Sequence, residues 1–344
     1  MIDIQSLVRK NIRDLKPYSS ARDEFQGKAS VFIDANENPY ETGYNRYPDP
    51  LQRELKQKIA EIKSVEPTQI FLGNGSDEAI DLLIRAFCEP GLDNILYPEP
   101  TYGMYKVSAG INGTEVVTVD LNEDFDLEAS VLFERVNHLT KIIFLCSPNN
   151  PSGNTLDEIE ILDILRKFRG IVVVDEAYID FCSSNGFAQY IDQFNNLIIL
   201  QTFSKAWGLA GIRLGMAFAN TEIINVLNRI KPPYNINALT QQEALKSLEN
   251  SAQKDKWVEE ILAERERLEK ALKDINVVKR VHPSDANFLL TVFEDAKGTY
   301  DYLVDKEIVV RDRSNVKLCD QCLRISVGTP EENDLLLGAL SKMK

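Results

Sequence analysis

Histidine and cysteine are scarce in this chain of 344 residues. The two histidines, His138 and His282, lie far apart in the sequence, and neither has the spacing of a metal site or a catalytic triad. The five cysteines are an odd, scattered set, which is typical of a reducing compartment and argues against a disulfide framework. Cys319 and Cys322 have the gap of a zinc knuckle or redox pair, but no second pair or nearby histidine completes four ligands. We therefore predict no metal site.

Excess positive charge is also absent. The chain carries 39 lysines and arginines against 53 aspartates and glutamates, which gives a net charge of -14. Nucleic acids and anionic membranes attract excess positive charge, so this balance argues against both as partners and favours small molecules. No apolar run approaches the length that spans a bilayer, and the charged residues after Met1 do not resemble a secretion signal. We predict a soluble, cytoplasmic protein.

What the chain does have is an alternation of apolar runs with helical stretches. Hydrophobic residues make up 44% of it, enough for a sizeable core and more than one domain. Several runs are apolar throughout, as in the strands of a parallel sheet that is covered on both faces. The predicted strands are 69–72, 94–97, 115–119, 141–146, 170–175, 197–201 and 213–219, with helices at 76–87 and 156–168. This order predicts an α/β sandwich.

The pattern changes from about residue 237 onward. Amphipathic helices at 241–249 and 254–273 are followed by short strands near 288–292, 308–311 and 323–327. We therefore divide the chain into a large domain, 29–236, and a smaller α+β domain, 237–344. A first helical segment, 4–15, is separated from the sheet by Lys16-Pro17-Tyr18. We expect this N-terminal arm, residues 1–28, to pack on the small domain.

Gly73-Asn74-Gly75-Ser76-Asp77-Glu78 lies between a predicted strand and a predicted helix. Such a turn presents free backbone N–H groups and the positive end of a helix, where an anion such as a phosphate can bind. The candidate ligands are Gly75, Ser76 and Asp77. The alternative is an ordinary turn in which Ser76 or Asp77 caps the helix.

Polar residues follow three further strands of the predicted sheet. They are Asn150 after 141–146, Asp175 and Tyr178 after 170–175, and Thr202, Ser204, Lys205 and Arg213 after 197–201. Taken singly, each residue also fits an ordinary structural role, as part of a turn, as a helix cap or as a solvated charge at the end of a strand. Open α/β sheets bind ligands at the carboxyl ends of their strands, so we expect these side chains to converge on one crevice. A buried Asp175 would need a cationic partner there.

This ordered set of motifs resembles the fold type I aminotransferases that use pyridoxal 5'-phosphate, and the resemblance covers nearly the whole chain. It implies a three-layer α/β/α large domain with a mostly parallel sheet and a smaller second domain. It also implies that Lys205 anchors the cofactor covalently and, once released, moves the proton between the substrate α-carbon and the cofactor. Asp175 would pair with the pyridine nitrogen and keep it protonated, so that the ring can accept electrons.

The resemblance implies further cofactor contacts. Asn150 and Tyr178 would hydrogen-bond the 3'-oxygen of the ring, and Tyr102 would stack on it, with Tyr105 as the next aromatic. The phosphate would be held by a charge-assisted set suited to a dianion. That set is Gly75, Ser76, Asp77, Ser204 and Arg213, with Thr202 as a further contact.

Two N-terminal motifs narrow the resemblance to histidinol-phosphate aminotransferases. They are Asn36-Glu37-Asn38-Pro39-Tyr40 and Asn45-Arg46-Tyr47-Pro48-Asp49. The matching tyrosine of that family reaches the cofactor phosphate of the neighbouring subunit, so Tyr47 implies a homodimer with shared active sites. Tyr18 would close over the substrate, and Asn36 belongs to the same substrate-binding set. A Tyr-Pro pair is also a common loop element.

Arg311 and Arg324, near the other end of the chain, match the same family. In amino-acid aminotransferases the position of Arg324 grips the substrate α-carboxylate through a bidentate pair, which lysine cannot provide. Histidinol phosphate has no carboxylate, so its phosphate would take that place, and Arg311 would add a second guanidinium. Surface ion pairs are the alternative for both arginines.

The resemblance favours amino transfer from histidinol phosphate to 2-oxoglutarate, which gives imidazole acetol phosphate and glutamate, in histidine biosynthesis. An aromatic or other amino-acid aminotransferase is the nearest alternative, because related enzymes share the cofactor residues. A lyase similar to the threonine-phosphate decarboxylases is a second alternative, and a cofactor-binding regulator without turnover is a third. The sequence assigns no residue to the imidazole ring.

Overall fold

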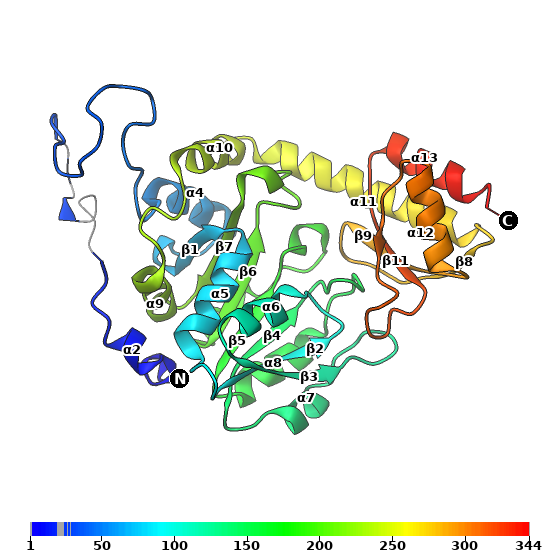
Figure 1. Cartoon of the computed structure of the whole chain (residues 1–344), viewed down its shortest axis with the longest axis horizontal. Helices are drawn as coiled ribbons and strands as arrows, with labels where there is room; N and C mark the ends of the chain where they lie inside the picture. Colours follow the sequence, from blue (N-terminus) through cyan, green and yellow to red (C-terminus); the bar gives the residue numbers. More distant parts are fainter. Residues whose placement is uncertain (1, 19–23, 26, 28, 344) are drawn as a thin grey trace.

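A seven-stranded sheet forms the centre of the large domain (Figure 1). The computed structural model describes residues 2–18, 24–25, 27 and 29–343. Neighbouring strands follow the order β1-β7-β6-β5-β4-β2-β3, and all pairs are parallel except those of β7 with β1 and β6. The strands are β1 Ile70–Asn74, β2 Asn94–Glu99, β3 Glu115–Asp120, β4 Thr140–Cys146, β5 Ile171–Asp175, β6 Leu197–Thr202 and β7 Leu214–Ala219.

Helices cover both faces of this sheet, which explains why its inner strands are apolar throughout. In β4, for example, Ile143 and Leu145 pack into one helix layer, whereas Ile142 and Phe144 pack into the other. One layer holds α5 Ser76–Phe87, α6 Met104–Ile111 and α9 Thr221–Ile230. The other holds α4 Arg53–Lys63, α7 Ala129–Arg135, α8 Glu158–Lys167 and α10 Ala238–Leu248. The predicted three-layer α/β/α fold with a mostly parallel sheet is confirmed.

The small domain is built on an antiparallel sheet in the order β10-β11-β9-β8. Its elements are β8 Val278–Val281, β9 Phe288–Phe293, α12 Ala296–Asp305, β10 Arg311–Asp312, β11 Cys322–Ser326 and α13 Pro330–Leu340. The helix α11, Ser251–Lys273, runs from the large domain to this sheet (Figure 1). Among the described residues, no helix is both long enough and apolar enough to cross a membrane.

The change of packing between the domains comes later than residue 237. Helix α10 packs against α4, and its Ala244 and Leu248 belong to the core of the large domain. Helix α11 is the first element to pack on the second sheet, through β8 and β9. The boundary that we drew at residue 237 therefore stands about one helix too early, because amphipathic spacing alone does not tell which sheet a helix covers.

The N-terminal segment packs on the large domain and not on the small one, so our expectation for this arm is wrong. It forms two short helices, α1 Ile4–Leu7 and α2 Lys10–Arg13, that lie against α9. Ile4, Val8 and Ile12 are buried in the same core as α5 and α9, and the Arg9 N–H donates to the Ala86 carbonyl at 3.0 Å. The apolar stripe at four-residue spacing is covered by the nearest helix layer.

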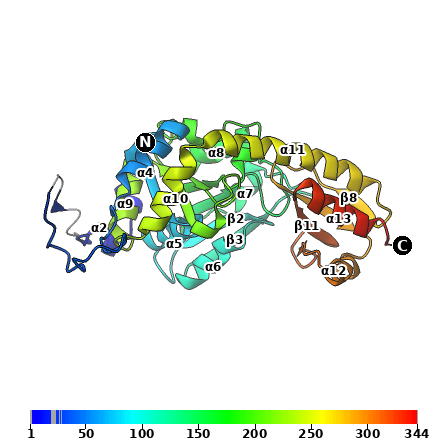
Figure 2. The same ribbon diagram turned by 90° about the horizontal axis from the view of Figure 1, so that it is seen from above.

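The described residues between α2 and α4 extend away from the body of the molecule (Figures 1 and 2). This segment stands at the end opposite the small domain (Figure 2). Several of its large apolar side chains face solvent, including Val31, Ile33 and Tyr40, which are 68%, 91% and 79% exposed. Near its end the segment returns to the large domain, where Tyr47 stacks on Tyr234.

Candidate active site

One crevice lies where the carboxyl ends of the parallel strands meet the start of β7. Its cavity volume is about 100 Å³. Every residue that we predicted to contact the cofactor lines it, except Tyr47. The lining consists of Gly75, Ser76, Asp77, Tyr102, Cys146, Asn150, Asp175, Ala177, Tyr178, Thr202, Ser204, Lys205 and Arg213. Strand ends that are distant in sequence are brought together by the sheet topology alone.

The turn between β1 and α5 is built around Gly75. This glycine has a φ of 72°, and a Cβ atom there would lie 2.7 Å from Nη2 of Arg213. The Gly75 N–H donates to the Arg213 carbonyl at 2.9 Å, which fixes the turn to the start of β7. No side chain caps α5, so the N–H groups of its first turn can be satisfied by an anion.

Asp77 links the two walls of the crevice. The Tyr102 hydroxyl donates to Asp77 Oδ1 at 3.0 Å, and Asp77 Oδ2 lies 3.6 Å from Arg213 Nη2. Burial, and then the neighbouring Asp77, raise the pKa of Tyr102, so its phenol stays protonated and keeps donating. On the opposite side, the Thr202 hydroxyl donates to Ser204 Oγ at 3.0 Å. The predicted phosphate ligands thus include two hydrogen-bonded or ion-paired groups of side chains that line the same crevice.

Asp175 is buried at the end of β5, and the sequence did not reveal what holds it. The Tyr105 hydroxyl donates to its Oδ2 at 2.8 Å, and the Ala177 N–H donates to its Oδ1 at 3.1 Å. Burial raises the pKa of Asp175 to about 6 despite these two hydrogen bonds, which act to lower it. Tyr105 does not line the crevice. Its ring stacks on Phe144 at 4.7 Å, behind the carboxylate.

Lys205 lies over the ring of Tyr178, with Nζ 5.3 Å from the ring centroid. Desolvation, and then the positive charge of Arg324, lower the pKa of Lys205. Tyr178 is 6% exposed and packs edge-on against Phe288 at 5.1 Å. Burial raises the pKa of the Tyr178 phenol, so its hydroxyl is a proton donor. The arrangement favours a neutral, nucleophilic amine beside a protonated phenol.

A second cleft adjoins the crevice and shares Tyr102, Asn150, Tyr178 and Lys205 with it. The small domain supplies its other wall through three arginines, Arg311, Arg313 and Arg324. Arg311 and Arg324 stand opposite each other on β10 and β11. The Arg324 Nη1 donates to Asn150 Oδ1 at 2.6 Å, which leaves the amide nitrogen of Asn150 as its remaining donor.

Arg313 is a cleft residue that we did not predict. A signal for it was present, because residues two apart in an extended strand lie on the same face, and Arg313 follows Arg311 by two positions. The Asp312 between them is turned to Ser314, whose backbone N–H donates to Asp312 Oδ1 at 2.8 Å. The carboxylate nearest in sequence is therefore engaged elsewhere.

The aminotransferase class I and II family model matches residues 26–340. The chain belongs to this family. It is 59% identical over 344 residues to a histidinol-phosphate aminotransferase of Parabacteroides distasonis, with 100% of both chains covered. Among solved structures, the histidinol-phosphate aminotransferase of Clostridium acetobutylicum is 27% identical with a TM-score of 0.80, covering 87% of this chain and 90% of that one. The L-threonine-O-3-phosphate decarboxylase of Porphyromonas gingivalis is 26% identical with a TM-score of 0.73, covering 86% and 89%.

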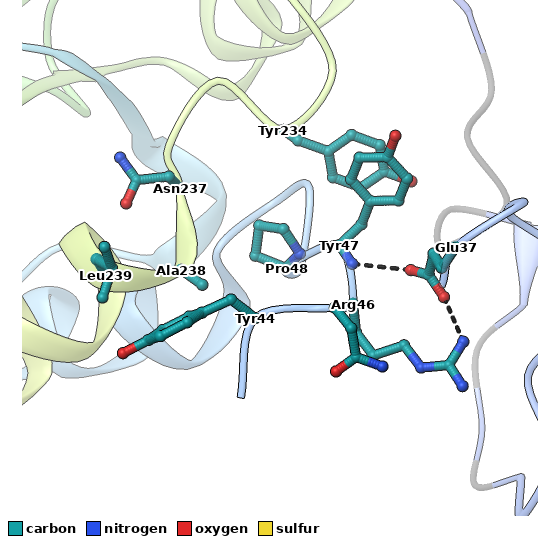
Figure 3. A pocket seen from close by; sticks show the side chains of 10 residues that line it. Glu37, Tyr44, Arg46, Tyr47, Pro48, Tyr234, Asn237, Ala238 and Leu239 are labelled. Carbon is teal, nitrogen blue, oxygen red and sulfur yellow. Dashed lines mark hydrogen bonds and ion pairs between the residues drawn. The ribbon is translucent and has the colours of Figure 1, made fainter. Parts of the chain in front are cut away.

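Three predicted residues of this aminotransferase, Tyr47, Tyr18 and Asn36, line neither the crevice nor the arginine cleft. Tyr47 stacks on Tyr234 with ring centroids 4.5 Å apart, and both line a separate surface pocket (Figure 3). The Tyr47 N–H donates to Glu37 Oε1 at 2.8 Å, and Arg46 pairs with the other oxygen of Glu37 at 2.7 Å (Figure 3). These bonds hold the Tyr-Pro motif in a defined loop next to α10.

Tyr18 and Asn36 are on the extended segment, away from the arginine cleft. Tyr18 is 74% exposed, and Asn36 is exposed with a φ of 55°. Neither residue lines the crevice or the cleft. The closure of Tyr18 over the substrate and the substrate role of Asn36 stay predictions. The motif residues 19–22 that follow Tyr18 lie outside the described residues.

Proposed function

We propose that this aminotransferase moves the amino group of histidinol phosphate to 2-oxoglutarate, as a step in histidine biosynthesis. One observation carries the proposal: Lys205 lines both the crevice with the predicted cofactor residues and the cleft with the arginines. A single amine can therefore serve the cofactor on one side and an anionic substrate on the other. The name of the 59% identical relative supports the same assignment.

The crevice residues fit pyridoxal 5'-phosphate. The Gly75 turn and the uncapped start of α5, together with Arg213 and Ser204, suit a phosphate dianion. Asp175 presents a buried carboxylate to the crevice, and a protonated pyridine nitrogen would supply the cation that it needs. When bound, this cofactor provides a sink for the electrons of the deprotonated substrate carbon.

Residues of this chain would carry out the proton transfer and hold the cofactor in place. Lys205, with its lowered pKa, would hold the cofactor covalently and, once free, would take up the proton of the substrate α-carbon. Tyr178 and the amide nitrogen of Asn150 would donate hydrogen bonds to the ring 3'-oxygen. Tyr102 would stack on the ring, and its bond to Asp77 fixes the orientation of its side chain. Thr202 supports Ser204 in the phosphate wall.

The arginine cleft receives the anionic end of each substrate in turn. Arg324 grips the phosphate of histidinol phosphate and, in the other half of the reaction, the α-carboxylate of 2-oxoglutarate. Its bond to Asn150 Oδ1 sets the direction of the guanidinium and links substrate recognition to the cofactor wall. Arg311 stands opposite Arg324 and adds the second cation that a phosphate dianion favours.

The experiment that tests this function compares four amines. Purified protein with 2-oxoglutarate is assayed against histidinol phosphate, phenylalanine, threonine phosphate and histidinol, and both glutamate and carbon dioxide are measured. We expect glutamate with histidinol phosphate at the highest kcat/KM. Carbon dioxide from threonine phosphate without glutamate would instead support a decarboxylase, as in the neighbour from Porphyromonas gingivalis.

We also propose that two copies of the chain form a homodimer in which Tyr47 reaches the phosphate of the partner's cofactor. The extended segment supports this, since its large apolar side chains lie on a surface that a second copy would cover. Asn36 and Tyr18, on the same segment, would then belong to the partner's substrate site. A cytoplasmic location suits the five free cysteines.

Mixing two inactive variants tests the shared site. In a heterodimer of Lys205→Ala and Tyr47→Phe chains, one of the two sites contains both wild-type residues. Random exchange therefore returns wild-type residues to about a quarter of all sites. We expect activity well above the sum of the two variants. No gain despite proven exchange of subunits, by mass spectrometry of the mixed dimer, would rule out sharing through Tyr47.

A further inference from the structure

Arg313 lies in the loop that joins β10 to β11, and it lines the cleft together with Arg311 and Arg324. Its backbone is fixed from both sides. The Arg313 N–H donates to the Cys322 carbonyl at 2.9 Å, and the Val316 N–H donates to the Arg313 carbonyl at 2.8 Å. The guanidinium is thus carried by a well-supported part of the hairpin, next to strand β11.

The three guanidinium groups of the cleft repel one another. Among the described residues, none of them forms an ion pair with a carboxylate. Desolvation, followed by the charges of Arg324 and Arg311, lowers the pKa of Arg313. Like charges placed this close and partly desolvated cost free energy unless an anion offsets them. The cleft is therefore built for a ligand with more than one negative charge.

Two nitrogens in this cluster lack partners within the described structure. They are the buried Nε atoms of Arg313 and Arg324. A buried N–H without an acceptor is costly, so the arginine cluster carries a free-energy cost as long as no anion balances its charge. Arg324 has one of its Nη groups engaged by Asn150, whereas no side-chain bond of Arg313 is made within the described residues.

We propose that Arg313 is a specificity-determining residue that binds the phosphate of a phosphorylated amine substrate, together with Arg311 and Arg324. The inference rests on the proposed function and deepens it. A phosphate monoester offers three oxygens that accept hydrogen bonds, enough for three guanidinium groups. A carboxylate offers two oxygens, which one or two arginines already satisfy. Arg313 therefore favours phosphorylated amines over amino acids of similar size.

Two Arg313 variants test the proposal against a control on the same loop. Arg313→Gln removes the charge, and Arg313→Lys keeps the charge but loses the planar fork. The control is Lys317→Gln, because Lys317 is a cation of the same loop that pairs with Asp120 outside the cleft. KM and kcat are measured for histidinol phosphate, histidinol and 2-oxoglutarate, together with competitive inhibition by inorganic phosphate.

We expect Arg313→Gln to raise KM for histidinol phosphate by about ten- to hundredfold, because it removes a charge-assisted contact. The inhibition constant of inorganic phosphate should rise in parallel. KM for histidinol, which lacks the phosphate, should stay within about threefold of the wild-type value. For histidinol phosphate, the KM of Arg313→Lys should lie between the values of wild type and Arg313→Gln. Lys317→Gln should match wild type.

Three outcomes separate the possibilities. An equal loss for histidinol and histidinol phosphate would overturn the proposal, because it would give Arg313 a purely structural role. Unchanged KM values in Arg313→Gln, with a wild-type protein that accepts histidinol phosphate, would overturn it too and leave the proposed function intact. A wild-type protein that does not accept histidinol phosphate would instead overturn the proposed function. If Arg313→Gln does not fold, Arg313→Lys and the phosphate inhibition decide.

Discussion

The cofactor crevice and the arginine cleft differ in how their charges are balanced. In the crevice, both carboxylates have partners from the protein: Asp77 lies near Arg213, and Asp175 accepts hydrogen bonds from Tyr105 and Ala177. In the cleft, three guanidinium groups face one another, and within the described chain no carboxylate pairs with them. The carboxylates of the crevice are thus partnered within the protein, whereas the guanidinium groups of the adjoining cleft are not.

The difference follows from the residence time of the ligand. A cofactor stays bound through many turnovers, so its binding residues can be fixed by the protein before it arrives. Substrates alternate, and a cleft that supplied its own carboxylates would compete with each incoming anion. Leaving the arginines unpaired costs stability but reserves their charge for the substrate, and this idea can be tested on both sides of the site.

The largest effect is expected at Lys205, the residue that both cavities share. Lys205→Ala should lower turnover on the order of 10⁴-fold, because it removes the covalent anchor and the proton carrier together. Borohydride treatment should no longer fix the cofactor to the chain, as measured by intact mass. The matched control is Lys254→Ala, a nearby lysine that lies over Trp207 and pairs with Asp180 and Asp255. Retained cofactor fixation in the Lys205 variant would place the anchor elsewhere.

A smaller but selective effect is expected on the cleft side. Arg311→Ala should raise KM for histidinol phosphate by roughly tenfold, and KM for 2-oxoglutarate by less, since Arg324 suffices for a carboxylate. High salt should reduce the difference between these two increases in KM, because Arg311 is exposed at the mouth of the cleft. Steady-state kinetics at two ionic strengths checks this. Equal losses for both substrates would mean that the cleft does not distinguish phosphate from carboxylate through Arg311.

The same contrast explains what could be predicted from the sequence. The crevice was predictable, because each of its residues follows an apolar strand and a parallel sheet gathers such strand ends at one edge. Tyr105 escaped prediction because its bond to Asp175 joins residues 70 positions apart, and no local pattern marks it. Arg313 did carry a local signal, its two-residue spacing from Arg311, which we did not use.

The small domain and the N-terminal segment were harder to predict. Strand β8, Val278–Val281, is short and half exposed, so its apolar pattern is weak. The strand predicted at 308–311 is present only as the two-residue β10. This strand lies at the edge of the sheet, and Val309 before it is 79% exposed. The packing of Ile4, Val8 and Ile12 depended on which domain offered an apolar face, and sequence periodicity does not encode that choice.

On the crevice side, removal of the hidden support for Asp175 should shift a pH dependence. The pKa of Asp175 is about 6, so it is ionised above that pH and able to pair with a protonated pyridine. Tyr105→Phe removes a hydrogen bond that lowers this pKa, so the pKa should rise. Asp77, Lys205 and Tyr178 also act on this carboxylate and are unchanged by the substitution, whereas Cys146, which interacts with both Tyr105 and Asp175, loses its contact with the Tyr105 hydroxyl.

The measurement is the dissociation constant of the cofactor between pH 5 and pH 8. The pH below which affinity falls should lie higher in Tyr105→Phe than in wild type, with affinity at neutral pH reduced by about tenfold. Tyr97→Phe is the control, because Tyr97 is a buried neighbour, 5.9 Å from Tyr105 between ring centroids. In an Asp175→Asn background, Tyr105→Phe should weaken cofactor binding little further. Full additivity would show that Tyr105 does not act through Asp175.

The smallest effect concerns Glu176, a carboxylate beside the crevice that takes no part in the proposed chemistry. It is 1% exposed and accepts hydrogen bonds from the Phe187 N–H at 2.6 Å and from Gln201 Nε2 at 2.8 Å. Burial raises its pKa to about 7. Because the folded pKa exceeds the unfolded value, its contribution to stability is fully present below the unfolded pKa and is lost as pH rises toward 7.

Glu176→Gln removes the group that causes this loss of stability. The free energy of unfolding of the variant should therefore rise relative to that of wild type between pH 5 and pH 8. The Gln201 Oε1 atom is buried without a partner in the described structure, and it could accept a bond from the new amide after a flip of Gln201. Urea unfolding at both pH values should give a difference in the free energy of unfolding that grows by roughly 2–3 kcal/mol in favour of the variant. A constant difference would mean that folding does not raise the pKa of Glu176, so that this carboxylate is ionised throughout the range in both states.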